Sequence, residues 1–255
     1  TFNLDAAQLE KAITPRTKCI IPVHLFGQAA DMDAIMAIAE KHQLYVVEDN
    51  AQAIGCNYRM KDGSTRKTGT IGHIGTTSFY PTKNLGGYGD GGALFTNDDT
   101  LAAKMLTITN HGSDRRYYYD SIGVNSRLDS LQAAILNAKL PHLDQYNRKR
   151  QQAADYYDKL LAGIEGIEIP ARAATSNHVF HQYTIRVKNR RDALQQFLQE
   201  AGIPSMIYYP VPLHLSKAYA EYGYQPGDFP VSEHAATEVL SLPMHTELDA
   251  DQIEY

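Results

Sequence analysis

The stretch KCIIPVHLFGQAADMDAIMAIAEKHQLYVVED, residues 18–49, decides the fold class of this 255-residue chain. Lys18 to Val23 is a short apolar run that predicts a strand, and Leu44 to Val47 predicts a second, buried strand. Between them, residues 31–42 carry apolar side chains at helical spacing, with acidic residues first and Lys41-His42 last. A strand, a helix and a strand joined by short links form a βαβ unit with parallel strands. The sequence therefore predicts an α/β fold with a mostly parallel sheet.

The rest of the chain extends this pattern and then changes near Ile167. Up to that point the expected elements are helices at Asp5–Ile13 (with Asp5 as its cap), Asp98–Thr109, Leu128–Leu140 and Tyr146–Leu161, and strands at Thr76–Tyr80 and Ala93–Thr96. Beyond it, the expected elements are strands at Tyr183–Val187 and Ile203–Tyr208 and a helix at Arg191–Ala201 that ends at Gly202. We therefore expect a large domain in residues 1–140, a connecting helix in 141–166 and a small α+β domain in 167–255.

Composition excludes several classes of protein. The chain is 43% hydrophobic, has a net charge of −5 and contains no run of basic residues, so a nucleic-acid surface is not expected. It has no stretch of 18 apolar residues, so a membrane-spanning helix is not expected. Two cysteines, Cys19 and Cys56, cannot form a disulfide framework or a four-cysteine zinc site. Reduced thiols in a cytoplasmic protein are the simple interpretation.

Two segments combine strand ends with reactive side chains. Glu48-Asp49 closes a predicted parallel strand, at the sheet edge where open α/β sheets bind ligands; the alternative is that Asp49 only caps a turn. Lys83 follows the strand that stops at Pro81, with Ser78, Thr82 and a run of glycines nearby. A lysine on a loop is usually a solvated charge, but an amine nucleophile needs a rigid, partly desolvated position of this kind.

Two further segments are candidate ligand contacts. Residues 86–92, GGYGDGG, contain the spacing G-x-G-x-x-G that is typical of dinucleotide-binding turns. They precede a predicted strand, however, whereas that motif precedes a helix. We therefore reject a dinucleotide site and expect a tight backbone passage beside a flat ligand. Asn125 and Arg127 precede a predicted helix, where anions bind readily; the alternative is a helix cap at Asn125 or Ser126 with a solvated arginine.

Other catalytic patterns are missing. The histidines show no H-E-x-x-H or comparable ligand spacing, and no serine lies in a G-x-S-x-G segment. Metal-dependent and serine hydrolases are therefore not expected, and we predict no metal site.

Taken together and in this order, the segments resemble the DegT/StrS group of sugar aminotransferases, which are pyridoxal-phosphate enzymes of the aspartate-aminotransferase fold (fold type I). The resemblance covers the whole chain, and the two most specific segments place Asp49 and Lys83 34 positions apart (83 minus 49). The matching segments are VVEDNAQAIG at 46–55, TSFYPTKNLGGYGDGGAL at 77–94, NHG at 110–112 and GVNSRLDSLQAAIL at 123–136, with weaker matches at 20–33, 208–214 and 240–245.

The resemblance implies a role for each matching residue. Lys83 would form the internal aldimine with pyridoxal phosphate and then move a proton between cofactor and sugar. Asp49 would pair with the pyridine nitrogen and keep it protonated. The remaining contacts implied are Ala51 against a ring face, Gln52 near the 3-hydroxyl, Ser78 on the phosphate, Asn125 on the phosphate of the partner subunit's cofactor, Arg127 on the partner's substrate, and Tyr208, Tyr209 and His214 near the sugar.

The resemblance also implies partners and a substrate class. The family transfers an amino group from L-glutamate to a keto carbon of a nucleotide-linked sugar, in amino-sugar or polysaccharide biosynthesis, as homodimers with shared active sites. The segment NSRLDxLQAA is similar to members that act at a 3-keto position, including the UDP-3-keto-glucuronic acid type, whose carboxylate would suit Arg127. The family pattern normally starts upstream with a Gly-Thr/Ser turn for the phosphate and an aromatic residue over the ring, so we expect this chain to be N-terminally incomplete.

Two other functions remain open at this point. A nicotinamide-dependent oxidoreductase is disfavoured by the misplaced glycine pattern. A catalytically silent protein of the same fold, acting as a regulator or a partner subunit, is disfavoured by the presence of both Lys83 and Asp49.

Overall fold

The computed structural model describes all residues, 1–255, and the chain forms two compact units. The first unit comprises Thr1–Arg148 together with Arg172–His181, and the second comprises Lys149–Ala171 together with Gln182–Tyr255. The expected domain boundaries at 140 and 166 stay a prediction. No helix in either unit has both the length and the apolar character that a bilayer crossing requires.

The first unit is built on a four-stranded sheet. Its strands are β1 (Cys19–Ile20), β2 (Tyr45–Asp49), β5 (Ile74–Ser78) and β6 (Gly92–Phe95), in the order β1-β2-β5-β6. The β1–β2 and β2–β5 pairs are parallel, and β5–β6 is antiparallel. The predicted α/β fold with a mostly parallel sheet is confirmed, and β6 alone reverses direction.

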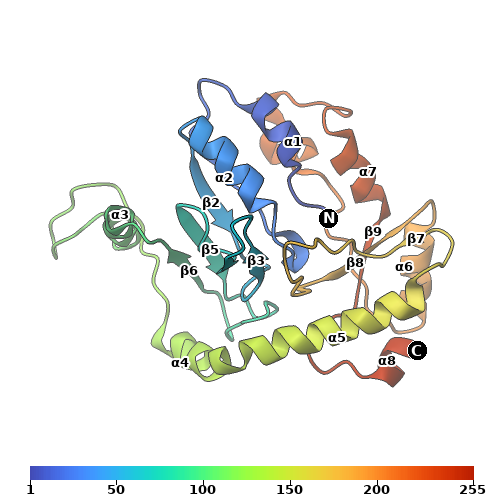
Figure 1. Cartoon of the computed structure of the whole chain (residues 1–255). Coiled ribbons are helices and arrows are strands. Elements are labelled where there is room, and N and C mark those ends of the chain that lie inside the picture. Colours follow the sequence, from blue (N-terminus) through green and yellow to red (C-terminus); the bar gives the residue numbers. More distant parts are fainter. The chain divides into compact units, whose positions relative to one another are not determined.

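Helix α2 (Met32–Lys41) makes the predicted crossover between β1 and β2. Asp31 caps it by accepting a hydrogen bond from the Ala34 N–H at 3.2 Å. Figure 1 shows α2 alongside β2, and its apolar stripe is buried, with Ile35 and Ala39 both 0% exposed. This stripe and the sheet form the main core of the first unit, which stabilises the strand ends that carry the candidate site.

Two smaller elements complete this side of the unit. Helix α1 (Ala6–Leu9) begins at the predicted cap, because the Asp5 carboxylate accepts a hydrogen bond from the Ala7 N–H, and a 3₁₀ turn at Glu10–Ala12 follows. The antiparallel hairpin of β3 (Asn57–Arg59) and β4 (Thr65–Lys67) was not predicted, because its strands are too short for a detectable alternation.

Three helices follow the sheet, as predicted. They are α3 (Asp99–Thr109), α4 (Ser130–Lys139) and α5 (Leu143–Leu161), with a 3₁₀ turn at Leu140–His142 between the last two. Figure 1 shows the segment between α3 and α4 as an extended arm beyond β6. Helix α5 begins earlier than the predicted Tyr146, and it carries the chain from the first unit into the second.

The second unit has an antiparallel three-stranded sheet. Its strands β7 (Ile167–Glu168), β8 (Tyr183–Val187) and β9 (Val239–Leu242) pair in that order. Three helices belong to this unit, α6 (Arg191–Glu200), α7 (Pro230–Glu238) and α8 (Ala250–Glu254), and 3₁₀ turns occupy Leu213–Leu215 and Lys217–Tyr222.

One predicted element of the second unit is wrong. Ile203–Tyr208 does not form a strand, although Met206 makes an isolated bridge with Ser241. The Met206 N–H donates to the Ser241 carbonyl at 3.1 Å, and the Ser241 N–H donates back at 2.7 Å. Pro204 has no N–H to donate, so the pairing does not extend toward the N-terminal side of this bridge.

Candidate active site

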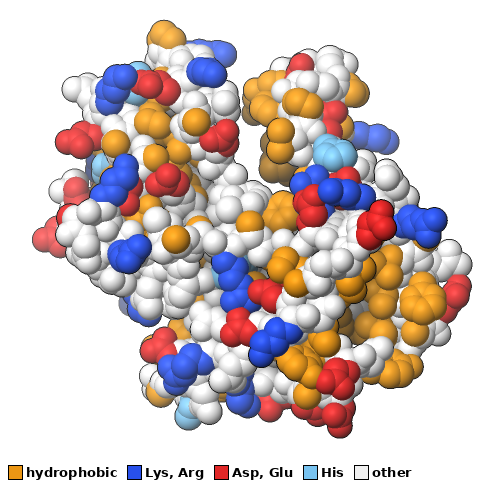
Figure 2. All heavy atoms as spheres, turned by 45° about the vertical axis from the view of Figure 1, so that its right-hand side comes forward, with side chains coloured by type: hydrophobic (Ala, Val, Ile, Leu, Met, Phe, Trp, Pro, Cys, Tyr) orange, Lys and Arg blue, Asp and Glu red, His pale blue; other side chains and the backbone are white.

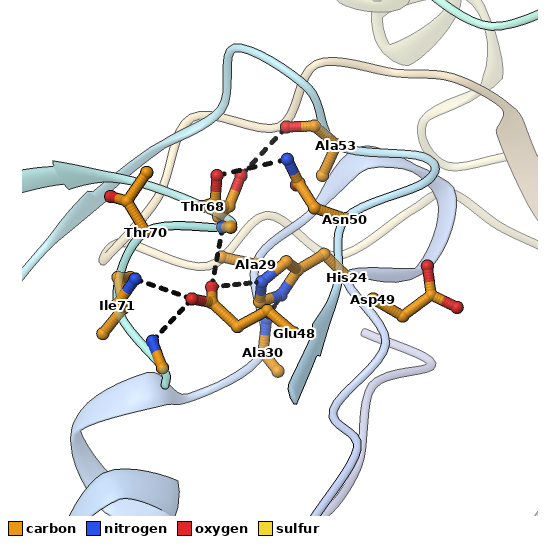
Figure 3. A network of polar contacts seen from close by, with 12 residues as sticks. His24, Ala29, Ala30, Glu48, Asp49, Asn50, Ala53, Thr68, Thr70 and Ile71 are labelled. Atoms are coloured by element: carbon orange, nitrogen blue, oxygen red, sulfur yellow. Dashed lines mark hydrogen bonds and ion pairs between the residues drawn. The ribbon is translucent and has the colours of Figure 1, made fainter. Parts of the chain in front are cut away.

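Asp49 is the last residue of β2 and lies at the carboxyl edge of the sheet. Its Cα pairs with that of Thr76 in β5, so the ends of the two parallel strands meet here. One carboxylate oxygen accepts a hydrogen bond from the Ala51 N–H at 3.0 Å, which closes a tight turn after the strand. Figure 3 shows the Asp49 carboxylate directed away from the buried polar network behind it. The half-buried carboxylate therefore faces the space beyond the strand ends.

Lys83 lies on the loop that leaves β5. Its N–H donates to the Tyr80 carbonyl at 2.9 Å, and its side chain is half-buried. Burial lowers the pKa of the Lys83 amine from its usual value, and the negative charge of Asp49 acts in the opposite direction. A lysine with a lowered pKa carries more of the neutral amine, which is the nucleophilic form. The structure thus brings the two most specific predicted residues into electrostatic contact.

The residues after Lys83 hold this loop rigidly. The Asn84 side-chain amide donates to Asn147 Oδ1 at 2.7 Å and to the Val179 carbonyl at 2.9 Å. Leu85 is 2% exposed and packs in a small core with Leu136 and its neighbours. These contacts give Lys83 the rigid, partly desolvated position that an amine nucleophile needs. Asn84 was missed from the sequence, because its two partners lie far along the chain.

The glycine run 86–92 is a tight passage, as predicted, and it leads into strand β6 rather than a helix. A Cβ on Gly86 would lie 2.4 Å from the Pro81 carbonyl oxygen, so no larger residue fits there. Helix α4 supports the run, because Gln132 Oε1 accepts a hydrogen bond from the Tyr88 N–H at 2.7 Å. The rejection of a dinucleotide motif is consistent with this geometry.

Gln52 and Ser78 lie close in sequence to the two central residues and already have partners. Gln52 Oε1 accepts a hydrogen bond from the Phe26 N–H at 2.6 Å, and Phe26 adopts a positive φ of 59°. Ser78 is the last residue of β5, and its Oγ accepts from the Tyr80 N–H at 3.2 Å. Both contacts fix the direction of the side chains. Their roles toward a cofactor stay a prediction.

Asn125 and Arg127 lie elsewhere in the first unit. Both are exposed, and Arg127 Nε donates to Asn125 Oδ1 at 2.8 Å. They line a cavity of about 1040 Å³ with residues of β5, β6 and α3, among them Thr76, the partner of Asp49 in the sheet. Helix α4 begins at Ser130, with Asp129 in the cap position and no side-chain cap hydrogen bond, so the alternative of a cap at Asn125 or Ser126 is wrong. Neither Asp49 nor Lys83 is among the residues that line this cavity.

Tyr208, Tyr209 and His214 belong to the second unit. His214 Nε2 lies 3.0 Å from Glu233 Oε1, and its ring packs against Phe229 with centroids 4.8 Å apart. These contacts hold the His214 ring in place within its unit. The proposed contacts of all three residues with a sugar stay a prediction.

No group of three or more His, Cys, Asp or Glu side chains is arranged to hold a metal ion. Cys19 and Cys56 are both free thiols, and burial raises the pKa of the Cys56 thiol to about 12. On the face that Figure 2 shows, basic and acidic side chains are interspersed with hydrophobic ones.

Comparison with known proteins extends this picture. A sequence profile of the DegT/DnrJ/EryC1/StrS aminotransferase family matches residues 1–255. A protein of Geobacillus stearothermophilus named pleiotropic regulatory protein is 52% identical over 257 residues, covering 100% of this chain and 68% of that protein. The UDP-2-acetamido-2-deoxy-3-oxo-D-glucuronate aminotransferase of Pseudomonas aeruginosa is 48% identical over 254 residues, again covering 100% of this chain and 68% of the relative.

The structural comparison agrees with the sequence comparison. The crystal structure of S. venezuelae DesV in complex with a ketimine intermediate superposes with a TM-score of 0.93 at 45% identity, covering 99% of this chain and 66% of that one. The chain therefore spans about two thirds of the length of these relatives. The predicted fold of pyridoxal-phosphate-dependent transferases is confirmed. With the family profile matched from end to end, this chain belongs to the DegT/DnrJ/EryC1/StrS family of aminotransferases.

Proposed function

We propose that the full-length protein is a pyridoxal-phosphate-dependent aminotransferase that moves an amino group from L-glutamate to the 3-keto carbon of a nucleotide-linked sugar. The observation that carries this proposal is the half-buried Lys83 amine, with its lowered pKa, on a rigid loop opposite the Asp49 carboxylate. Its proposed place is the cytoplasm, because both cysteines are free thiols.

The residues at the strand ends fit pyridoxal phosphate. The site offers an amine for the aldehyde carbon and a carboxylate for the ring nitrogen, and no competing metal cluster is present. When bound, this cofactor supplies a conjugated ring that accepts the electron pair left on carbon after a proton is removed. Lys83 would hold the cofactor and Asp49 would orient it.

Asp49 acts through its negative charge. A carboxylate within ~4–6 Å of a basic nitrogen favours the protonated form of that nitrogen. The turn to the Ala51 N–H fixes the carboxylate direction, so the charge is in place before a ligand arrives. Ala51 itself, half-buried in this turn, is the proposed contact for one face of the ring.

Lys83 acts through its amine. Because burial lowers its pKa, more of the side chain is the neutral amine, which can attack a carbonyl carbon and accept a proton. The rigid loop keeps the Nζ atom at one place during these steps. Gln52 is the proposed neighbour of the ring hydroxyl, and Ser78 the proposed partner of the phosphate.

The proposal includes a homodimer whose sites are shared. Asn125 and Arg127 are exposed and line a cavity that Lys83 does not line, which supports a role at the site of a partner subunit. Large apolar side chains near this pair in the sequence are open to solvent, with Tyr117 at 72%, Ile122 at 98% and Leu131 at 71% exposure. An exposed apolar surface of this kind is typical of subunit contacts.

The substrate class rests on relatives and on one side chain. A 48% identical relative is named a 3-oxo-D-glucuronate aminotransferase. Arg127 would pair with the carboxylate of such a sugar in a bidentate arrangement. Tyr208, Tyr209 and His214 are the further proposed contacts of the sugar.

A regulatory role is the second candidate, because the 52% identical relative is named a pleiotropic regulatory protein. The visible spectrum of the purified full-length protein, recorded with and without L-glutamate, separates the two. We expect a yellow protein whose colour is bleached by glutamate, with release of 2-oxoglutarate. A yellow protein that glutamate leaves unchanged would contradict the aminotransferase proposal and support the regulatory one.

A further inference from the structure

A buried carboxylate lies directly behind Asp49. Glu48 is 0% exposed, and its side chain points into the interior, whereas that of Asp49 points outward (Figure 3). Its Oε1 accepts hydrogen bonds from the N–H groups of Ile71 and Gly72, both at 2.6 Å. Its Oε2 accepts from the Gly69 N–H at 2.8 Å and contacts His24 Nε2 at 2.9 Å. Four donors therefore surround one carboxylate that water does not reach.

His24 contributes the fourth donor through Nε2. Its Nδ1 accepts a hydrogen bond from the Ala30 N–H at 3.1 Å, so that nitrogen carries no proton. The proton is then on Nε2, which donates to Glu48. Burial by itself would raise the pKa of Glu48, but the hydrogen bonds from His24, Gly72 and Gly69 outweigh it and the pKa lies below its usual value.

His24 also holds the next residue of the strand. The His24 N–H donates to the Asp49 carbonyl at 3.0 Å, and the Asp49 N–H donates to the Pro22 carbonyl at 2.9 Å. The ring of His24 therefore fixes residue 48, and its backbone fixes residue 49. Because successive side chains of a strand point to opposite faces, holding Glu48 inward sets the outward direction of Asp49.

The loop that binds Glu48 leaves no room for movement. A Cβ on Gly75 in β5 would lie 1.9 Å from the Gly69 carbonyl oxygen, so this loop packs directly on the neighbouring strand. On its other side, Asn50 Nδ2 donates to the Thr68 carbonyl at 3.1 Å. The end of β2 is thus tied to two separate loops, through residues 48, 49 and 50.

We propose that Glu48 and His24 are positioning residues for Asp49, which clamp the end of β2 so that the Asp49 carboxylate keeps one direction and one distance from Lys83. The inference rests on the proposed function only for the role of Asp49 toward a cofactor. The clamp, formed by Glu48 and His24, is made entirely of residues of this chain and is present without a cofactor. A fully hydrogen-bonded buried network gives rigidity, and the loss of one member leaves donors without acceptors.

Glu48→Gln and His24→Leu test the clamp from its two sides. In Glu48→Gln, the new NH₂ group faces the donors of Gly69 and His24, so the network cannot close. His24→Leu leaves Glu48 its three backbone donors and is the milder change. The matched control is His73→Gln, because His73 Nδ1 accepts from the Val46 N–H at 2.9 Å, near the opposite end of β2.

The first measurement needs no cofactor. The full-length apoprotein is labelled with acetic anhydride over a range of pH, and peptide mapping gives the midpoint for Lys83. Asp49→Asn removes an attractive charge and should move this midpoint to lower pH. Both clamp variants should move it in the same direction by part of that shift, whereas His73→Gln should leave it at the wild-type value.

The second measurement is the glutamate half-reaction of the loaded protein. Misplacement of a reacting group by about 1 Å can cost about 10²-fold, so each clamp variant should lose about tenfold to a hundredfold in rate with KM nearly unchanged. Combined with Asp49→Asn, either clamp change should add little further loss, because it acts through Asp49.

The outcomes separate this inference from the proposed function. The positioning role would be overturned if the rate losses of a clamp change and of Asp49→Asn multiply in the double variants. It would also be overturned if folded clamp variants have a lowered melting temperature but the wild-type labelling midpoint of Lys83. If Glu48→Gln does not fold, His24→Leu decides by the same criteria. If the wild-type protein does not react with glutamate, the proposed function fails, and the Lys83 midpoints of the apoproteins still decide the clamp.

Discussion

Asp49 and Lys83 lie at the ends of two neighbouring parallel strands, and the negative charge of Asp49 favours the protonated form of the Lys83 amine. Asp49 ends β2, and Lys83 lies on the loop beyond β5, whose residue Thr76 pairs with Asp49. Burial lowers the pKa of Lys83, and Asp49 limits that fall. All variants below are made in the full-length protein.

Lys83→Ala should abolish transamination and still permit non-covalent binding of pyridoxal phosphate, because the other proposed contacts of the ring and phosphate remain. Borohydride reduction of the wild-type protein, followed by peptide mapping, should place the pyridoxyl label on Lys83. The exposed Lys41, which pairs with Glu10, provides a control, and Lys41→Ala should react normally. A label on any other lysine shows that the assignment is wrong.

Asp49→Asn should keep the fold and the covalent cofactor and lower kcat by about 10²–10⁴-fold. The amide retains the size of the side chain but carries no charge to hold a proton on the ring nitrogen. Steady-state kinetics with L-glutamate measure the loss, and Asp62→Asn on an exposed turn serves as the control. A near-normal kcat in Asp49→Asn would contradict the ring-nitrogen role.

Mixed dimers should show whether the sites are shared. Lys83→Ala and Arg127→Ala homodimers should each be inactive or nearly so. A heterodimer of the two has one site that lacks both groups and one site with both intact, so co-expression should restore at most about half of the activity per heterodimer. Two differently tagged subunits allow the heterodimer to be purified, and an inactive heterodimer would refute sharing.

Acid should weaken the fold in part through Glu48. The pKa of Glu48 is lower in the folded protein than its ordinary value of 4.5, so the folded state favours the ionised form. Its contribution to stability is therefore present above pH 4.5 and is lost as the pH falls through the lower, folded value.

Chemical denaturation of the wild-type protein and of Glu48→Gln, between pH 7 and pH 3, tests this sign. At pH 7 the variant should be less stable by about 1–3 kcal/mol for each donor left without an acceptor. The gap between the two proteins should narrow below pH 4.5. A gap that stays constant over the whole range would show that Glu48 has the same pKa in both states.

The βαβ unit and the later helices could be predicted from local pattern. Helix α2 forms where the apolar spacing predicted it, and the apolar stripe that includes Ile35 is buried. Periodicity determines which face of an element is buried, and capping depends on residues a few positions apart, so both can be read from neighbours in sequence. The strand predicted at Ile203–Tyr208 was wrong because strand propensity does not specify a neighbouring strand. Only Met206 in this segment forms a bridge.

The sequence by itself pointed to the strand ends as the candidate site. Asp49 and Lys83 were candidates because a carboxylate after a parallel strand and a lysine beside glycines are short-range features of the chain, and the family resemblance implied their roles. Tertiary structure alone decided what holds them. Glu48 contacts His24, 24 residues away, and Gly69, 21 residues away, and Asn84 contacts Val179, 95 residues away. Hydrogen bonds across such separations depend on how strands and loops pack, and no local pattern of residue types specifies that packing.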